Sequence, residues 1–139
     1  MSLDLEESVF IDKVELLDGL HGTIQLYSGN QMTQSILSIG ANSVIRLSGL
    51  KDYNDVYQND ATVTLEELVE RITDTPVSGV TTPMSLLYVP SSNGVYEGAL
   101  PYNIGIEARK VYRATIRAIS SGGLRKDWVE TIKVKVAEA

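Results

Sequence analysis

The chain has 139 residues, of which 43% are hydrophobic and 22% are charged, so it is long enough for one domain with a real core. Its formal net charge of −6 makes nucleic acid and anionic membranes poor partners, because an acidic chain repels phosphate groups. The absence of Cys excludes disulfides and thiolate metal sites.

The N-terminal segment does not have the pattern of a targeting sequence. No apolar run approaches the roughly 20 residues of a membrane span. The first ten residues are acidic, where a secretory signal peptide would be basic. The sequence therefore predicts a soluble chain without a signal peptide or a transmembrane segment.

The first 43 residues contain short β-type segments separated by Gly and Asn. Residues 8–17 are rich in apolar side chains and fit either a strand or a short helix, whereas residues 23–27 and 32–39 have the character of strands. Strands this short cannot build a separate core. We therefore expect residues 1–43 to form an N-terminal β-rich extension that either adds strands to the main domain or reaches a neighbouring subunit. The main domain, residues 44–139, opens with an alternating strand at residues 44–50.

A polar loop, KDYNDVYQND, follows at residues 51–60. The calcium loop of an EF-hand requires Gly at its sixth position, but counting from Asp52 places Tyr57 there. We interpret the segment as a loop whose Asp and Asn side chains hydrogen-bond to the local backbone. Tyr53 and Tyr57 are our candidate contact residues, because Tyr is enriched at protein interfaces.

Residues 61–73 are compatible with two structures. Thr64 and Glu67 have the spacing of a helical capping box, and the apolar residues that follow recur at helical intervals. Ala61, Val63 and Leu65 also alternate as in a strand. The alternatives are a strand that ends in a helical turn and a single bulged strand, and we favour a segment that is mostly strand.

Two hairpins are expected in the second half of the chain. Residues 84–89 and 95–100 flank an Asn93-Gly94 turn, which favours hairpin closure, and Tyr88 and Tyr96 would pair across it. In the closing hairpin, residues 106–136, apolar residues alternate with polar ones around a Gly-Gly turn, and we expect Trp128 to belong to its buried face. Basic residues crowd this hairpin, and we interpret them as a solvated face in preference to an anion-binding patch.

The spacing of Ile106 and Tyr112, six residues apart before an alternating strand, resembles a corner of fibronectin type III and immunoglobulin-like domains. The resemblance implies an all-β, immunoglobulin-like antiparallel sandwich in which the Tyr hydroxyl bonds to the upstream backbone. The chain departs from antibody-type domains in lacking Cys and in carrying its Trp on the last strand. The hairpin at residues 84–100 and the run YRATIRA from Tyr112 also resemble small immunoglobulin-like proteins of tailed bacteriophages and prophages.

Catalytic chemistry has little support in the sequence. The single imidazole, His21, lies between glycines and has no recognisable partner motif for a nucleophile, so we interpret it as an exposed turn residue.

We predict no cofactor and no metal, and we predict a non-enzymatic structural or assembly module that contacts protein partners or itself. The resemblance implies that it resides in the cytoplasm before any assembly into a virion. The alternative is a carbohydrate- or surface-binding module, which would gather exposed aromatic side chains on one face.

Overall fold

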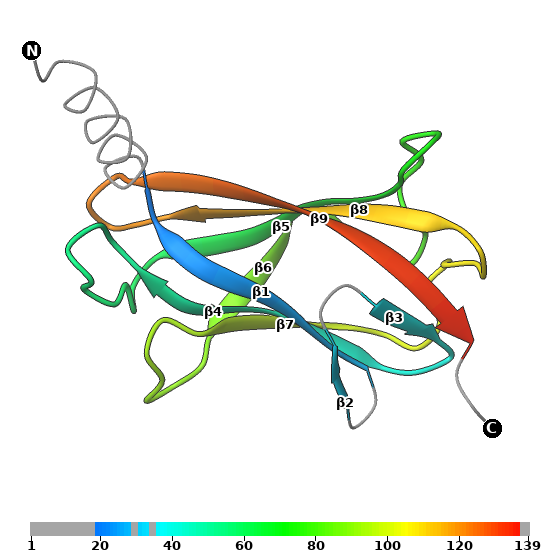
Figure 1. The fold of residues 1–139 in the computed structure, drawn as a ribbon, viewed down its shortest axis with the longest axis horizontal. Coiled ribbons are helices and arrows are strands. Elements are labelled where there is room, and N and C mark those ends of the chain that lie inside the picture. The colour runs from blue at the N-terminus through cyan, green and yellow to red at the C-terminus, as the bar shows by residue number, and fades with distance from the viewer. Residues whose placement is uncertain (1–18, 29–30, 34–35, 137–139) are drawn as a thin grey trace, which may run out of the picture.

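The computed structural model describes residues 19–28, 31–33 and 36–136 (Figure 1). Within these ranges all regular elements are strands and no helix occurs, so the all-β prediction is confirmed. The strands are β1 (His21–Ser28), β2 (Gln31–Thr33), β3 (Ile36–Ile39), β4 (Ser43–Lys51), β5 (Thr62–Glu70), β6 (Met84–Tyr88), β7 (Tyr96–Leu100), β8 (Val111–Ile119) and β9 (Arg125–Val136).

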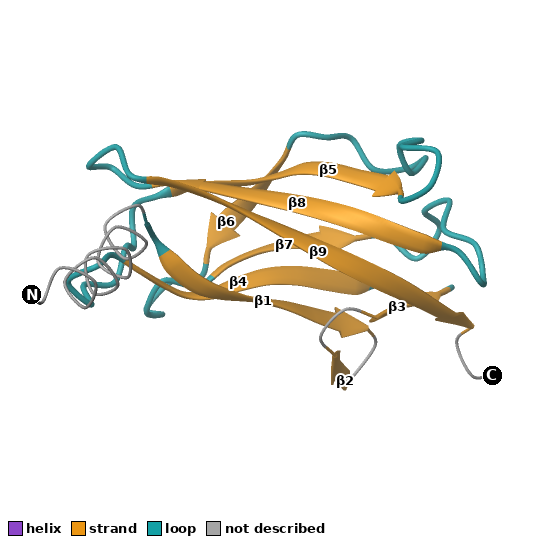
Figure 2. Cartoon of the chain, turned by 45° about the horizontal axis from the view of Figure 1, so that its top comes forward, coloured by secondary structure: helices purple, strands orange, loops and turns teal. Residues whose placement is uncertain are grey.

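The strands form one mixed sheet in the order β2-β1-β4-β7-β6-β5-β8-β9-β3. Neighbouring strands are antiparallel, except that β3 and β9 are parallel. Strand β6 pairs with both β5 and β7, and it thereby joins a layer of β1, β4 and β7 to a layer of β5, β8 and β9 (Figure 2). The sheet curls until β1 and β9 contact each other, which nearly closes it into a barrel.

The first strands belong to the same sheet and core as the later ones. Strand β1 pairs with β4 and β3 pairs with the end of β9, while Leu20, Ile24, Leu26 and Leu37 are buried in the common core. Strands β1, β2 and β3 therefore belong to the main sheet. The strand expected at residues 32–39 covers parts of β2 and β3, and the segment at residues 8–17 lies outside the described residues.

The ambiguous segment at residues 61–73 is a bulged strand, β5, that ends at Glu70. Its register against β8 shifts between Leu65 and Glu67, which marks a β-bulge. Val63, Leu65 and Leu68 are all buried, because the inserted residue returns Leu68 to the inward face. The bulge thus explains the three-residue apolar spacing that also fitted a helix.

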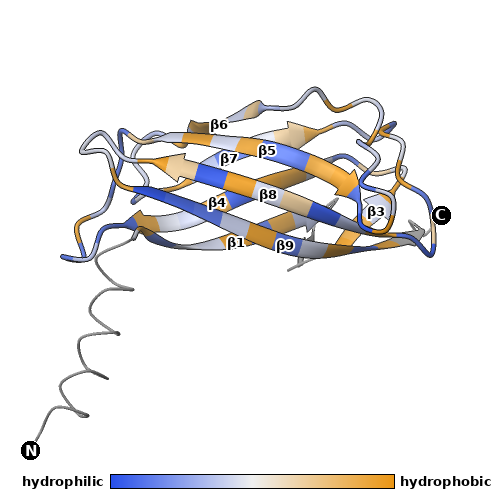
Figure 3. Cartoon of the chain, turned by 90° about the horizontal axis from the view of Figure 1, so that it is seen from above, coloured by the Kyte–Doolittle hydropathy of each residue, from blue (hydrophilic) through white to orange (hydrophobic). Residues whose placement is uncertain are grey.

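Both predicted hairpins are present. Tyr88 lies opposite Tyr96 in the β6–β7 register, with ring centroids 5.6 Å apart. Buried and partly exposed residues alternate along most of β8, and the same hydropathy alternation is visible along β8 and β9 in Figure 3. On β9, Ile132 is buried, whereas Trp128 is only partly buried against the core.

The chain before β8 is fixed by Tyr112. This side chain is buried, and its hydroxyl accepts a hydrogen bond from the backbone N–H of Glu107 at 2.9 Å. Ile106 is also buried. The predicted bond between the Tyr hydroxyl and the upstream backbone is therefore present, with the backbone as donor.

Candidate functional site

Several connections meet at one end of the sheet. The N–H of Leu50, near the end of β4, donates to the carbonyl of Gly94 in the β6–β7 loop at 2.9 Å. The N–H of Gly94 donates to the side-chain oxygen of Asn59 in the β4–β5 loop at 2.7 Å. Lys51 also pairs in register with His21, the first residue of β1. These bonds hold two loops and two strand ends together.

The β4–β5 loop is organised by its own side chains, as predicted. The Asp52 carboxylate accepts hydrogen bonds from the N–H groups of Asn54 at 2.8 Å and Val56 at 3.0 Å. Tyr53 and Tyr57 are 43% and 44% exposed. Their role as contact residues stays a prediction, but the structure brings only Tyr57 to the pocket that lies beside this loop.

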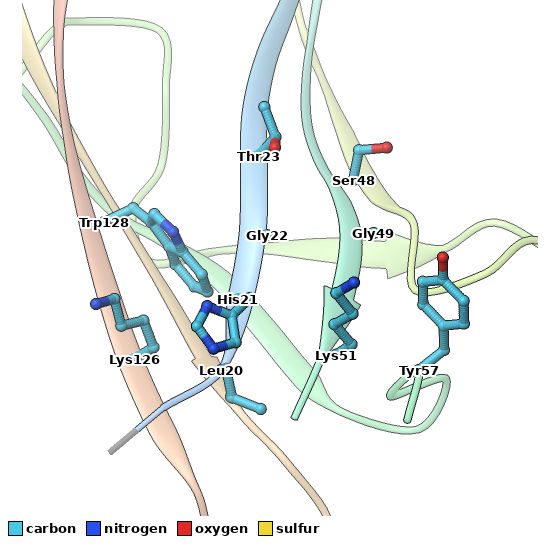
Figure 4. Close-up of a pocket in the computed structure, with 10 residues that line it drawn as sticks. All are labelled: Leu20, His21, Gly22, Thr23, Ser48, Gly49, Lys51, Tyr57, Lys126 and Trp128. Atoms are coloured by element: carbon cyan, nitrogen blue, oxygen red, sulfur yellow. The ribbon is translucent and has the colours of Figure 1, made fainter. Parts of the chain in front are cut away.

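This pocket, with a volume of about 460 Å³, spans the start of β1. Figure 4 shows His21 next to Trp128 on one side of it, and Lys51 and Tyr57 on the other. Residues from β1, β4, β9 and the β4–β5 loop line it: Leu20, His21, Gly22, Thr23, Ser48, Gly49, Lys51, Tyr57, Lys126 and Trp128.

Two glycines keep the middle of the pocket free of side chains. The β1–β4 register shifts between His21 and Thr23, where β4 carries an extra residue and Gly49 has a φ of 70°. A Cβ at Gly49 would meet no atom within 4 Å, whereas a Cβ at Gly22 would lie 2.7 Å from the side chain of Leu47. Gly49 therefore borders open space, and Gly22 allows β1 to lie close to β4.

The sequence did not identify two aromatic side chains of this pocket. The interpretation of His21 as a turn residue is wrong, because it begins β1 and is only partly exposed. Trp128 packs against the core as expected but also lines the pocket. The available signal was a lone Trp close to a hairpin turn, but its proximity to β1 depends on pairing between distant strands.

Strands β1 and β9 contact each other but are not paired as neighbouring strands, and we call this junction the seam. Strand β9 pairs with β8 from Arg125 to Lys133 but with β3 only from Lys133 onward. Strand β1 pairs with β2 only from Leu26 onward. Among the described residues, the edges at 21–25 and 125–132 therefore have no partner strand on the side of the seam.

The basic residues of the closing hairpin are largely paired with carboxylates. Arg113 lies 2.8 Å from Asp74, and Arg117 lies 3.0 Å from both Glu66 and Asp127. The hydrogen bond from Arg117 lowers the pKa of the Asp127 carboxyl. These pairs offset the charge of the outer face of β8 and β9, and this face is a poor anion-binding patch.

Glu130 lies on the inward face of β9, opposite Ala114 in the register and two residues from Trp128 and Ile132. Partial burial raises the pKa of its carboxyl. The folded protein therefore keeps this proton at pH values where the unfolded chain has released it. It follows that the free energy of unfolding falls as the pH rises from the ordinary Glu value through the raised pKa.

We expect Glu130→Gln to raise the melting temperature at neutral pH, where the wild-type carboxylate is charged and partly desolvated. The gain should vanish near pH 3, where the wild-type carboxyl is protonated in both states. Thermal unfolding followed by circular dichroism measures both values. Asp60→Asn, at an exposed carboxylate, is the control without such a gain. Equal stability of Glu130→Gln and wild type at neutral pH would contradict the assignment.

Comparison of the chain with family models, with curated proteins and with solved structures found no match. In the described ranges, no group of three or more His, Cys, Asp or Glu side chains is arranged to hold a metal ion. The same part of the chain contains no helix long and apolar enough to cross a membrane.

Proposed function

We propose that the protein is a non-enzymatic structural or assembly module that associates with a second copy of itself by strand addition at the seam. The observation that carries the proposal is the pair of unpartnered strand edges on β1 and β9. Exposed edges of this kind are templates for pairing with another chain.

The direction of the strands allows an extended segment to join either edge. Six antiparallel pairings separate β1 from β9 in the sheet order, so the two strands run in the same direction. A strand that runs opposite to them is antiparallel to whichever of the two edges it joins, which is the more stable arrangement per residue. Val129, on the outer face of the β9 edge, is 61% exposed and adds apolar surface for a partner.

One positive charge at the seam favours an acidic partner segment. Lys126 lies on the β9 edge and takes part in no ion pair among the described residues, whereas Arg125 lies 3.4 Å from the Asp127 carboxylate. Residues 1–18 contain six acidic residues, one Lys and several apolar residues. Its carboxylates can pair with Lys126, and the same segment of a second copy is the partner that we propose.

The strand order supports an immunoglobulin-like classification. If β1 and β4 to β9 are taken as strands A to G, the sheet order contains A-B-E-D followed by C-F-G. These two groups are the sheets of a constant-type immunoglobulin domain, and the Tyr112 corner agrees with that assignment. The sequence resemblance to small immunoglobulin-like proteins of tailed phages supports a role as a virion component or accessory module.

Molar mass measured by light scattering over a range of concentrations tests self-association. We expect mass to increase with concentration in the wild type. Val129→Lys should weaken association about tenfold, because it adds a charge to the apolar edge. Leu87→Lys is the matched control: Leu87 is 70% exposed on β6, away from the seam, and its variant should associate like the wild type.

A wild type that stays monomeric up to its solubility limit would overturn the proposal. Equal weakening by Val129→Lys and Leu87→Lys would also overturn it, because association would then depend on general surface hydrophobicity and not on the seam.

A further inference from the structure

The geometry points to the pocket beside β1 as a binding site for a sugar that carries a carboxylate, such as a hexuronic acid at the end of a surface glycan. This site shares residues 21–23, Lys126 and Trp128 with the strand edges of the seam, so a strand added there and a sugar bound in the pocket would exclude each other. The inference does not depend on self-association.

The dimensions of the pocket suit a small ligand. Its volume of about 460 Å³ lies within the roughly 300–1,000 Å³ of small-molecule sites. The glycine positions keep its middle open, since nothing lies within 4 Å of a Cβ built on Gly49. A sugar ring could therefore approach the β1 and β4 backbone closely.

Aromatic and hydroxyl groups supply the contacts that a sugar ring requires. The Trp128 indole is held by packing against the core while it lines the pocket, so it is a fixed surface for the apolar C–H face of a sugar. Tyr57 lies on the opposite side (Figure 4). The hydroxyls of Thr23, Ser48 and Tyr57 can donate and accept hydrogen bonds with sugar hydroxyls.

The charge of the pocket selects an acidic sugar over a neutral one. Its lining contains Lys51, Lys126 and His21 but no Asp or Glu, although the whole chain has a net charge of −6. Lys51 lies 3.3 Å from the carboxylate of Asp55, which is 82% exposed. A ligand carboxylate can replace that exposed group and gain a charge-assisted hydrogen bond in a less solvated position.

The ligand can be detected without a label, because Trp128 is the only Trp of the chain. The full-length protein is titrated with an oligosaccharide of glucuronic acid, a neutral glucose oligosaccharide of equal length, and an acidic peptide. We expect a saturable change in Trp fluorescence with the acidic sugar and much weaker binding of the other two.

Charge-removing variants locate the site. Lys51→Gln and Lys126→Gln should each weaken binding of the acidic oligosaccharide about tenfold, through loss of one charged contact. Lys133→Gln removes the same charge from an exposed position on β9 outside the pocket lining, and it should bind like the wild type. Unchanged melting temperatures would show that these variants keep the fold.

Three results would overturn the inference. They are the absence of a saturable signal with the acidic sugar, equal binding of the neutral oligosaccharide, and equal binding of the acidic peptide. An equal loss of binding in Lys133→Gln would do the same, because it would indicate general electrostatic attraction.

Discussion

Gly94→Ala should lower the free energy of unfolding by about 3 kcal/mol, the combined effect of left-handed backbone strain and a backbone displacement. Gly94 has a φ of 67°, which a residue with a side chain rarely adopts. A Cβ at this position would lie 2.4 Å from the carbonyl oxygen of Leu50 and 2.6 Å from its nitrogen. Backbone atoms cannot rotate away as a side chain can, so the loop has to move.

Gly123→Ala is the control that separates the two effects. Gly123 has a φ of 92°, but a Cβ at this position would meet no atom within 4 Å. Only backbone strain applies there, and we expect a loss of about 1 kcal/mol. Urea unfolding of both variants measures the difference in free energy of unfolding. Equal losses would show that the contact with Leu50 adds no destabilisation beyond the backbone strain.

A displacement of Gly94 should also affect the pocket. Its N–H binds the side chain of Asn59, and Asn59 follows Tyr57 by two residues in the β4–β5 loop. A displaced β6–β7 loop would therefore loosen the loop that carries Tyr57. In a titration with the acidic oligosaccharide, Gly94→Ala should weaken binding, whereas Gly123→Ala should not.

Local patterns in the sequence were sufficient for the elements but not for their long-range pairing. The β8–β9 hairpin could be predicted because its alternation and its turn are contiguous in the chain. The bulge in β5 was an open alternative, because the side-chain pattern of a bulged strand overlaps with that of a helix over a few residues.

The pocket could not be predicted for a related reason. His21 and Lys51 are thirty positions apart in the numbering of the chain and meet only because β1 pairs with β4. Trp128 then reaches the same place because the sheet curls and brings β9 against β1. Neither the pairing of β1 with β4 nor the curling of the sheet produces a local sequence pattern. Tyr57 was therefore the only pocket residue among the predicted contact residues.

Tyr96 connects the core to the same loop through its hydroxyl. The side chain is 1% exposed; its hydroxyl donates to the carbonyl of Gln58 at 2.6 Å and accepts from the N–H of Ala61 at 2.9 Å. Burial raises the pKa of this hydroxyl. The folded state therefore keeps the proton when the unfolded chain releases it, and the free energy of unfolding falls as the pH rises above the ordinary Tyr value.

Tyr96→Phe should lower the free energy of unfolding by about 2–3 kcal/mol, because it leaves both a carbonyl and an N–H without a partner. Tyr112→Phe loses one hydrogen bond, from the N–H of Glu107, and should cost about 1–2 kcal/mol. Urea unfolding of the two variants at neutral pH gives the comparison. A smaller loss for Tyr96→Phe than for Tyr112→Phe would mean that water replaces the hydroxyl between Gln58 and Ala61, and that the loop is held mainly through Gly94.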